Sequence, residues 1–310
     1  MFYPAPRPAD AFHFERIVYR KDGYTATVTI NRPEKYNALD FQTLVEFGAA
    51  FQDASWDDAI AVVVLTGAGE RAFSTGADLT EQIKFQERPH DYWKWFGAFQ
   101  EAHDRLRNIG KPTIARLNGI VVGGGNEFHI ACDFAVAAEH VTIRQVGTAR
   151  GSVPAAGATQ WLPLIVGERR AREIVFLCEE IPAQKALEWG LVNQVVPKGE
   201  LDQAVAALAR KLYEKLPEST RYAKQQLNFW RDFSWGVTVG HARDWLTMHV
   251  PSAETGEGIA AFQQRRPMDY AGLRAGLAEP QTKTCGNCGA TGLPKESAYC
   301  LRCGQPLQDR

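Results

Sequence analysis

The chain has 310 residues, of which 45% are hydrophobic and 23% are charged, and its formal net charge is −1. This composition is typical of a globular protein with one large domain, or with one domain and an appendage. The balanced charge argues against nucleic acid or a membrane surface as a partner, and no apolar run is long enough to cross a bilayer.

In chain order, the sequence begins with a proline-rich stretch that has no apolar signal segment, so we expect a cytoplasmic protein. Residues 24–30 are β-branched and alternating, which predicts a strand, and Asp40 is a suitable N-cap for a helix through Phe51. Residues 61–65 are continuously apolar, as in a strand of a sheet covered on both faces. The same patterns predict strands at residues 112–117, 134–138 and 191–196, and helices at residues 91–109, 160–166, 169–177 and 182–189. Helices are also expected at residues 201–215, 219–230 and 254–264, so the fold class is α/β with a helical C-terminal part.

The stretch Gly123-Gly124-Gly125-Asn126-Glu127 carries the strongest chemical signal. Glycines that open an amphipathic helix expose backbone N–H groups at its N-terminus, where negative charge is stabilised. A carboxylate, that of Glu127, stands two residues after the last glycine. Amide donors beside an acid/base group suit chemistry next to a carbonyl, although a glycine run can also serve only close helix packing.

The order and spacing of several motifs resemble the crotonase (enoyl-CoA hydratase/isomerase) superfamily. These motifs are Ile30–Leu39, Phe73–Leu79, Lys111–Ala115 with Asn118-Gly119, the triple glycine, Cys132-Asp133, Gly151–Pro154, Gly157–Gln160 and Ala186–Val192. The resemblance implies a crotonase-type spiral of ββα units, assembled as trimers or dimers of trimers. It also implies an acyl-CoA thioester as substrate. Two backbone N–H groups, those of Ala77 and Gly124, would stabilise the enolate formed at the thioester carbonyl.

Glu127 matches the acid/base position of the family, behind this oxyanion hole. A purely electrostatic role at the helix start is the alternative. The chain departs from the ordinary hydratase pattern at Gly147, because the better-known hydratases carry a second glutamate there. Hydration by two carboxylates on one water is therefore in doubt, and Gly147 could leave room for a bulkier substrate, a water or an anion.

The resemblance also implies contacts with the CoA part of the substrate. The family places CoA against the loop after the first strands, which here runs from Lys35 to Ala38. Gly76 and Asp78, on either side of Ala77, are expected to contact the substrate too. Arg266 stands where the family often has a basic residue for a phosphate, although a solvated surface charge is an equal alternative.

A subgroup match narrows the expected substrate. The 6-oxocyclohex-1-ene-1-carbonyl-CoA hydrolases add water to a ring and then open it. Their pattern is similar to Gly123–Glu127, Gln145–Gly147 and Gly157–Leu164 of this chain. The aromatic residues from Phe85 to Phe99 correspond to the region that covers the acyl group, and they would suit an apolar ring. Ordinary core packing of an amphipathic helix is the alternative.

Four of the six cysteines form two CxxC pairs near the C-terminus: Cys285, Cys288, Cys300 and Cys303. Eleven residues separate the two pairs, which is slightly tighter than the commonest spacing, but four thiolates placed in this way can enclose a tetrahedral, structural Zn²⁺. Disulfides are rare in the cytoplasm. We therefore expect a zinc ribbon at residues 285–310, a linker at 275–284 and an acyl-CoA domain at 1–274. The ribbon is expected to dock a protein partner. Nucleic acid is a poorer fit because few basic or aromatic residues are interleaved there.

The sequence thus predicts an acyl-CoA-processing enzyme in which Glu127 moves a proton or activates water. The expected reaction is hydration or hydrolytic ring opening of an unsaturated or oxo-cyclic acyl-CoA. Two alternatives stay open. One is a plain enoyl-CoA hydratase or isomerase with one carboxylate, and the other is a non-catalytic scaffold that binds CoA esters and recruits a partner through the zinc ribbon.

Overall fold

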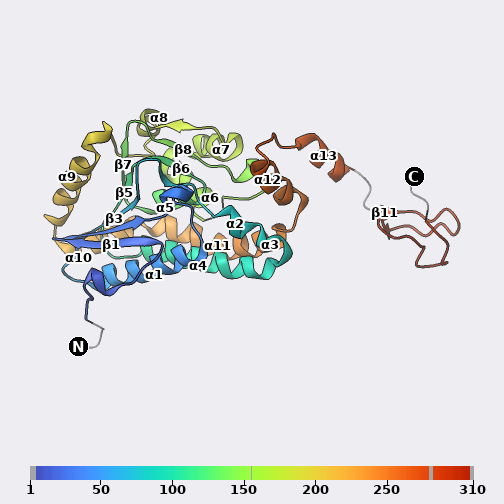
Figure 1. The fold of residues 1–310 in the computed structure, drawn as a ribbon, viewed down its shortest axis with the longest axis horizontal. Coiled ribbons are helices and arrows are strands. Elements are labelled where there is room, and N and C mark those ends of the chain that lie inside the picture. Colours follow the sequence, from blue (N-terminus) through green and yellow to red (C-terminus); the bar gives the residue numbers. More distant parts are fainter. Residues whose placement is uncertain (1–4, 155, 279–281, 308–310) are drawn as a thin grey trace. The chain divides into compact units, whose positions relative to one another are not determined.

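The computed structural model describes residues 5–154, 156–278 and 282–307. The chain divides into two compact units, Met1–Ile259 and Ala260–Arg310. The first unit holds two sheets and most of the helices, and the second holds a short helix and the four clustered cysteines (Figure 1).

The larger sheet of the first unit is built around the apolar strand that the sequence predicts near residue 61. This strand, β3 (Val62–Gly67), is buried along its whole length. The strand order is β1-β2-β3-β5-β7-β10. The other bounds are Ile17–Asp22 for β1, Thr25–Ile30 for β2, Thr113–Leu117 for β5, Phe134–Ala138 for β7 and Gln194–Val196 for β10. β1 and β2 form an antiparallel hairpin, while the remaining neighbours pair in parallel, as a strand buried on both faces requires.

A smaller sheet has the order β4-β6-β8-β9. Its strands are β4 (Ala72–Ser74), β6 (Ile120–Val122), β8 (Thr142–Arg144) and β9 (Ile181–Pro182), and the first three pair in parallel. Each of these three follows a strand of the larger sheet, because β3 leads to β4, β5 to β6 and β7 to β8. Helices follow each pair. The chain therefore repeats ββα units with like strands in parallel, which is the spiral that the resemblance implies.

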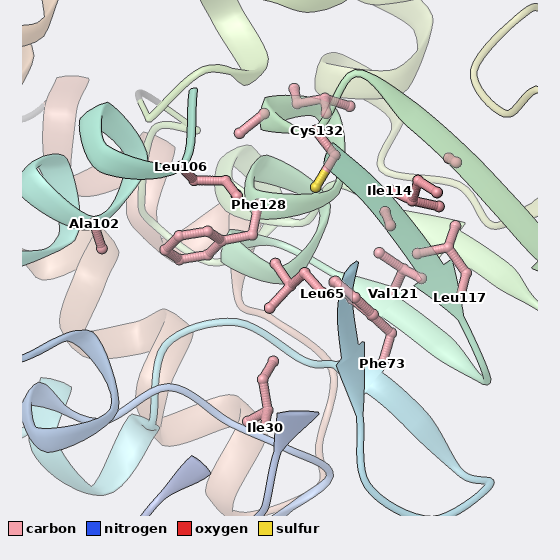
Figure 2. Packing of buried hydrophobic residues seen from close by; sticks show 14 of the residues in the cluster. Ile30, Leu65, Phe73, Ala102, Leu106, Ile114, Leu117, Val121, Phe128 and Cys132 are labelled. Atoms are coloured by element: carbon pink, nitrogen blue, oxygen red, sulfur yellow. The ribbon is translucent and has the colours of Figure 1, made fainter. Parts of the chain in front are cut away.

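Three helices position the centre of the first unit. The first, α1 (Phe41–Trp56), begins at Asp40, whose side chain accepts a hydrogen bond from the Thr43 N–H, so the predicted N-cap is confirmed. The second is α4 (Pro89–Arg107), and the third is α5 (Gly124–Ala131), which is buried from its second residue to its last. Figure 2 shows Phe128 of α5 extending between α4 and Leu65 of β3. The glycine-led helix is therefore part of the core.

The remaining helices of the first unit are α2 (Leu79–Gln82), α3 (Lys84–Glu87), α6 (Ala158–Val166), α7 (Glu168–Leu177), α8 (Ala183–Glu188), α9 (Leu201–Tyr213), α10 (Pro217–Leu227) and α11 (Phe229–His249), with α12 (Ala253–Gln263) at the boundary of the two units. The sequence patterns miss α11, because its glycines and β-branched residues have low helix propensity. Buried contacts of Trp235, Val239 and Leu246 stabilise it instead. The strands of the smaller sheet are also missed, since two or three residues show no periodicity. Within the described ranges, no helix has the length and apolar character needed to cross a membrane.

In the second unit, α13 (Tyr270–Ala278) precedes an antiparallel pair, β11 (Thr282–Lys283) with β12 (Leu293–Pro294). Residues 275–278 of the expected linker belong to this helix, and residues 279–281 lie outside the described part. The two units divide between Ile259 and Ala260, and a domain boundary near residue 275 stays a prediction. Residues 308–310 of the expected ribbon also lie outside the described part.

Candidate active site

Close contacts at the start of α5 require the glycine run before Glu127. Gly123, the N-cap, has a φ of +56°, which residues with side chains rarely adopt. A Cβ on Gly124 would lie 3.0 Å from the Phe99 ring, and a Cβ on Gly125 would lie 2.3 Å from the Ser74 carbonyl oxygen. The bare backbone therefore lets the N-terminus of α5 contact both α4 and β4. The first N–H groups of the helix have no partner inside it.

A second backbone segment, Gly76-Ala77, lies against this helix N-terminus. Gly76 has a φ of +81°, and a Cβ there would lie 2.6 Å from the Gly124 nitrogen. Ala77 forms an isolated parallel bridge with Leu39, in which Leu39 N donates to the Gly76 carbonyl at 2.8 Å and Asp78 N donates to the Leu39 carbonyl at 2.9 Å. The bridge uses the Gly76 carbonyl and the Asp78 N–H, which stand on either side of Ala77, so the Ala77 N–H points away from Leu39. The structure thus brings the Ala77 and Gly124 amides to one place, and no partner for either N–H is found within the described residues.

The loop that the resemblance assigns to CoA, Lys35 through Ala38, is held by Arg32 and Asn37. Asn37 is buried with a left-handed φ of 55°, and its side-chain oxygen accepts a hydrogen bond from Arg32 N at 3.1 Å. The Arg32 guanidinium donates to the Ala38 carbonyl at 2.5 Å and to the Asp78 carboxylate at 2.7 Å. Arg32 therefore joins the CoA loop to the Ala77 segment. Lys35 is exposed on this loop.

Asp78 is engaged in holding the Ala77 segment. One oxygen accepts a hydrogen bond from Thr80 N at 2.9 Å and caps α2, and the other pairs with Arg32. Burial by itself raises the pKa of Asp78, but the bonds from Thr80 and Arg32 outweigh it and hold the pKa below its ordinary value. An ionised Asp78 thus positions the neighbouring amide. Direct contact with substrate stays a prediction.

Glu127 lies in the first turn of α5 with 5% of its surface exposed. Its Oε1 accepts a hydrogen bond from Ala156 N at 2.8 Å. Burial raises the pKa of Glu127 to about 8, against the smaller lowering effect of the Ala156 and Ala158 amides. Both protonation states are therefore populated near neutral pH, which suits a group that takes up and returns a proton.

Gly147 packs against the segment that contacts Glu127. A Cβ at Gly147 would lie 2.9 Å from the Pro154 ring. The nearby Gln145 accepts a hydrogen bond from Asn126 of α5 at 3.0 Å, which ties this loop to the helix that carries Glu127. A side chain at position 147 thus requires Pro154 to move. Pro154 therefore fills the space beside Gly147 in the direction of a Cβ, where the sequence suggests room for a water, an anion or a bulky acyl group. A contact between Gly147 and the substrate stays a prediction.

The aromatic segment forms a buried stripe on α4 that consists of Tyr92, Trp95, Phe96 and Phe99. The Phe99 ring lies 5.1 Å from the Trp95 ring and 5.4 Å from the Phe128 ring of α5, between centroids. Trp93 is not part of this stripe, because 40% of it is exposed and the Arg243 guanidinium lies 3.4 Å from its ring centroid. Four of the five aromatics expected between residues 92 and 99 therefore lie on the side of α4 that faces the core.

Arg266 belongs to the second unit. Its side chain donates to Gln264 Oε1 at 2.8 Å and to the Pro267 carbonyl at 3.0 Å. These are local contacts, and a role of Arg266 in phosphate binding stays a prediction.

The cysteines of the two CxxC pairs come together in the second unit. Their Sγ atoms all lie within 4.8 Å of one another. The Sγ–Sγ distance is 3.7 Å for Cys285 and Cys303, and 3.6 Å for Cys288 and Cys300. In each pair, the glycine that follows donates its N–H to the first cysteine carbonyl at 2.9 Å, and its φ is 69° or 71°. A tetrahedral Zn²⁺ with Zn–S bonds of about 2.3 Å separates its sulfurs by about 3.8 Å, so the four thiols fit that ion.

Two contacts of the site have no signal in the local sequence. The Ala156 N–H reaches Glu127 from a position 29 residues later, and the Phe99 ring touches Gly124 from the preceding helix. The positive φ of Gly157, +107°, is the nearest hint, because it marks a tight backbone turn beside Ala156.

The chain is similar to proteins of known family and structure. The sequence profile of the enoyl-CoA hydratase/isomerase family matches residues 21–273. An enoyl-CoA hydratase from Bacillus anthracis is 31% identical, with a TM-score of 0.66, over 83% of this chain and 100% of that chain. An enoyl-CoA hydratase from Mycobacterium avium subsp. paratuberculosis K-10 is 26% identical, with a TM-score of 0.75, over 83% and 98%. DspI from Pseudomonas aeruginosa is 31% identical, with a TM-score of 0.66, over 84% and 99%.

Proposed function

The chain belongs to the enoyl-CoA hydratase/isomerase family of acyl-CoA-processing enzymes, and we propose that it adds water to an unsaturated or oxo-cyclic acyl-CoA and opens the ring of a cyclic one. The observation that carries this proposal is one buried carboxylate, Glu127, beside two convergent backbone amides, with Gly147 at the position of a second carboxylate.

The amides of Ala77 and Gly124 suit a thioester carbonyl. When water adds to the β-carbon of an α,β-unsaturated thioester, negative charge develops on the carbonyl oxygen. Two fixed N–H donors stabilise that charge without reorganising, and losing one such donor costs about 10²–10³-fold in rate. The absence of a Cβ on Gly76 and Gly124 is what lets the two segments approach each other.

Glu127 supplies the proton chemistry. In its ionised form it takes a proton from water, and in its protonated form it returns that proton to the α-carbon of the enolate. Its pKa of about 8 keeps both forms accessible near neutral pH. The aromatic stripe beside it favours an apolar acyl group, which supports a ring over a polar chain.

The substrate proposal is tested with a panel of acyl-CoA esters and mass spectrometry of the products. We expect a cyclic dienoyl- or oxo-enoyl-CoA to gain water, with a higher kcat/KM than crotonyl-CoA. Turnover of crotonyl-CoA alone would favour the plain one-carboxylate hydratase. No turnover of any ester would contradict the proposed function.

Binding of CoA would use the loop from Lys35 to Ala38, with Gly76 and Asp78 beside it. The exposed ammonium of Lys35 can pair with a phosphate of CoA. Arg266 belongs to the second unit, and a phosphate contact by its guanidinium is a separate proposal. A lower affinity for CoA in a Lys35→Ala variant, measured by calorimetry, would support this placement, and an unchanged affinity would contradict it.

An exposed apolar face supports assembly into a trimer or a dimer of trimers. On α10 and α11, five large apolar side chains recur at short intervals and are 58–79% exposed: Leu227, Phe229, Trp230, Phe233 and Val237. An apolar stripe of this kind is a typical contact surface between proteins. A monomeric mass in sedimentation equilibrium would contradict this assignment.

We also propose that the four cysteines hold a structural Zn²⁺, with a protein partner as the target of the ribbon. Four thiolates fill a tetrahedral shell and leave no open position, so this ion stabilises the fold of the small module. A site made of four thiolates requires a compartment in which cysteines stay reduced, and the cytoplasm that we propose is such a compartment.

Removal of one ligand should release the metal and leave turnover intact. We expect about one zinc per chain in the purified protein, loss of the metal in Cys300→Ser, and a kcat within about threefold of wild type. Cys178→Ser is the matched control, because Cys178 is a buried thiol of the first unit outside the cluster. Zinc content is measured by elemental analysis. Full zinc retention in Cys300→Ser would contradict the four-thiolate site.

A further inference from the structure

The Glu127 carboxylate is held at the N-terminus of α6. Ala156, which directly precedes the N-cap Gly157, is 1% exposed, and its N–H donates to Glu127 Oε1 at 2.8 Å. Burial raises the pKa of Glu127, and the amides of Ala156 and Ala158 act in the opposite direction. A helix N-terminus stabilises a carboxylate in this way, because its first N–H groups have no partner inside the helix. The turn formed by residues 156–158 therefore determines where this carboxylate lies.

The N–H group between those two amides has a different partner. Gly157 N donates to Oε1 of Gln160 at 3.0 Å. Gln160 is the third residue of α6 and is 8% exposed, and a glutamine at this position typically accepts the N–H of the N-cap residue. A buried N–H without an acceptor is destabilising. Without the Gln160 oxygen, the turn would have to rotate to bring the Gly157 N–H to another acceptor.

Trp161 packs on the same turn from the next position of α6. Gly157 has a φ of +107°, and a Cβ there would lie 2.5 Å from the Trp161 ring. Trp161 is fully buried, and its backbone N–H donates to the Gly157 carbonyl at 2.7 Å. Its indole N–H donates to the Arg231 carbonyl of α11 at 3.2 Å. The ring therefore limits how far Gly157 can move, and the direction of the Gly157 N–H depends on Gln160.

The side-chain amide of Gln160 is oriented by groups at both of its ends. Its Nε2 donates to Thr238 Oγ1 of α11 at 3.0 Å, and the Thr238 hydroxyl donates in turn to the Ser234 carbonyl at 2.7 Å. Its Oε1 accepts from the Thr159 hydroxyl at 3.0 Å as well as from Gly157 N. The nitrogen thus faces α11, and the oxygen faces the turn that holds Glu127.

We propose that Gln160 is a positioning residue for the reaction: by accepting the Gly157 N–H it fixes the turn that directs the Ala156 N–H to Glu127, and so sets where the carboxylate exchanges its proton. This inference rests on the proposed function, in which Glu127 is the acid/base group. Gln160 acts through Glu127 and not on the substrate. A general acid/base must lie within about 2.6–3.2 Å of the atom that it serves, so a small rotation of the turn lowers the rate.

The test is Gln160→Met, which keeps an unbranched side chain of similar length and removes the acceptor oxygen. We expect kcat for hydration to fall about 10- to 100-fold, because a displacement of about 1 Å has an effect of this size. Exchange of the α-hydrogens of butyryl-CoA in D₂O should fall by the same factor, since it also uses Glu127. Affinity for a saturated acyl-CoA should change less than about threefold, because Gln160 does not act on the substrate.

Thr238→Val is the matched control. It removes the partner of the Gln160 nitrogen on α11 and leaves the bond between Gly157 N and the Gln160 oxygen, so kcat should stay within about threefold of wild type. A loss in Thr238→Val as large as that in Gln160→Met would overturn the proposal, because the contact between α6 and α11 would then set the rate.

A double-mutant cycle with Glu127→Gln tests whether Gln160 acts through the carboxylate. In the Glu127→Gln background, Gln160→Met should change the remaining kcat by less than about twofold, since the group that it positions is already lost. The same 10- to 100-fold loss in both backgrounds would overturn the role of Gln160, because the substitution would then act on the fold or on the two amides.

Two further results separate this inference from the proposed function. A wild-type kcat in Gln160→Met would overturn the role of Gln160 and leave the proposed function intact. A wild-type enzyme that neither hydrates nor exchanges any acyl-CoA would overturn the proposed function and this inference together.

Discussion

Replacement of Glu127 by glutamine is expected to lower kcat by about 10²–10⁴-fold, because the site then lacks the general acid/base that we propose. Affinity for a non-reacting CoA ester should stay close to that of wild type. The glutamine oxygen can still accept from Ala156 N, as the carboxylate does at 2.8 Å, so the local structure is kept. Steady-state kinetics and calorimetric titration with a saturated acyl-CoA measure the two effects.

Glu46→Gln is the control for a buried carboxylate outside the site. Glu46 accepts hydrogen bonds from the backbone N–H groups of Glu15, Arg16 and Ile17 at 2.8–3.1 Å. Its replacement should lower the melting temperature and leave kcat nearly unchanged. Full activity in Glu127→Gln would remove Glu127 from the mechanism.

The same variant should change how stability depends on pH. Burial raises the pKa of Glu127 in the folded protein to about 8, whereas its ordinary value is 4.5. Below the ordinary pKa, Glu127 is protonated in both the folded and the unfolded chain, so its ionisation does not change the free energy of unfolding. As the pH rises from the ordinary value to the raised one, the unfolded chain ionises first and the folded state loses stability relative to it, by about 1.4 kcal/mol for each pH unit between the two pKa values. Glutamine does not titrate. Thermal melts should therefore show Glu127→Gln equal to wild type near pH 4 and more stable near pH 9. Equal melting temperatures at both pH values would contradict a raised pKa.

The parts of the site that the sequence predicts are those that depend on local residue type. The glycine run is readable because a positive φ and close backbone contact both require glycine, as at Gly123 and Gly76. The cysteine cluster can also be predicted from local residue type, because each CxxC pair forms a turn that is closed by the glycine directly after it. The N-cap at Asp40 could be predicted because its hydrogen bond, from the Thr43 N–H, spans only three residues of the chain.

The parts that the sequence does not give are contacts between distant segments. Nothing near Arg32 indicates that its guanidinium joins Ala38 to Asp78, 46 residues away from it. The raised pKa of Glu127 depends on burial by several elements together. The aromatic segment predicts an apolar wall, but the helix periodicity does not show that Tyr92 is buried in it while Trp93 is 40% exposed. These properties follow from how α4 crosses α5, and the crossing is set by tertiary packing.

Replacement of Gly76 by alanine is expected to lower kcat by at least about 10²-fold, because the two amides act together on one oxygen in the mechanism that we propose. The new Cβ would lie 2.6 Å from the Gly124 nitrogen, so one backbone segment must move. Both donors must stay about 2.7–3.1 Å from the oxyanion, and a shift of even part of an ångström takes one of them out of range. The φ of +81° adds strain of about 1–3 kcal/mol, which should also lower the melting temperature.

Gly23→Ala separates the strain from the clash. Gly23 turns the β1–β2 hairpin with a φ of +52°, and a Cβ there meets nothing within 4 Å. It should lose stability to a similar degree and keep its kcat, measured well below the melting temperature of both variants. A Gly76→Ala enzyme with wild-type kcat would mean that the Gly76-Ala77 segment tolerates displacement. The Ala77 amide could then not be one of two precisely placed donors, and the charge on the thioester oxygen would have to be stabilised by the start of α5 alone.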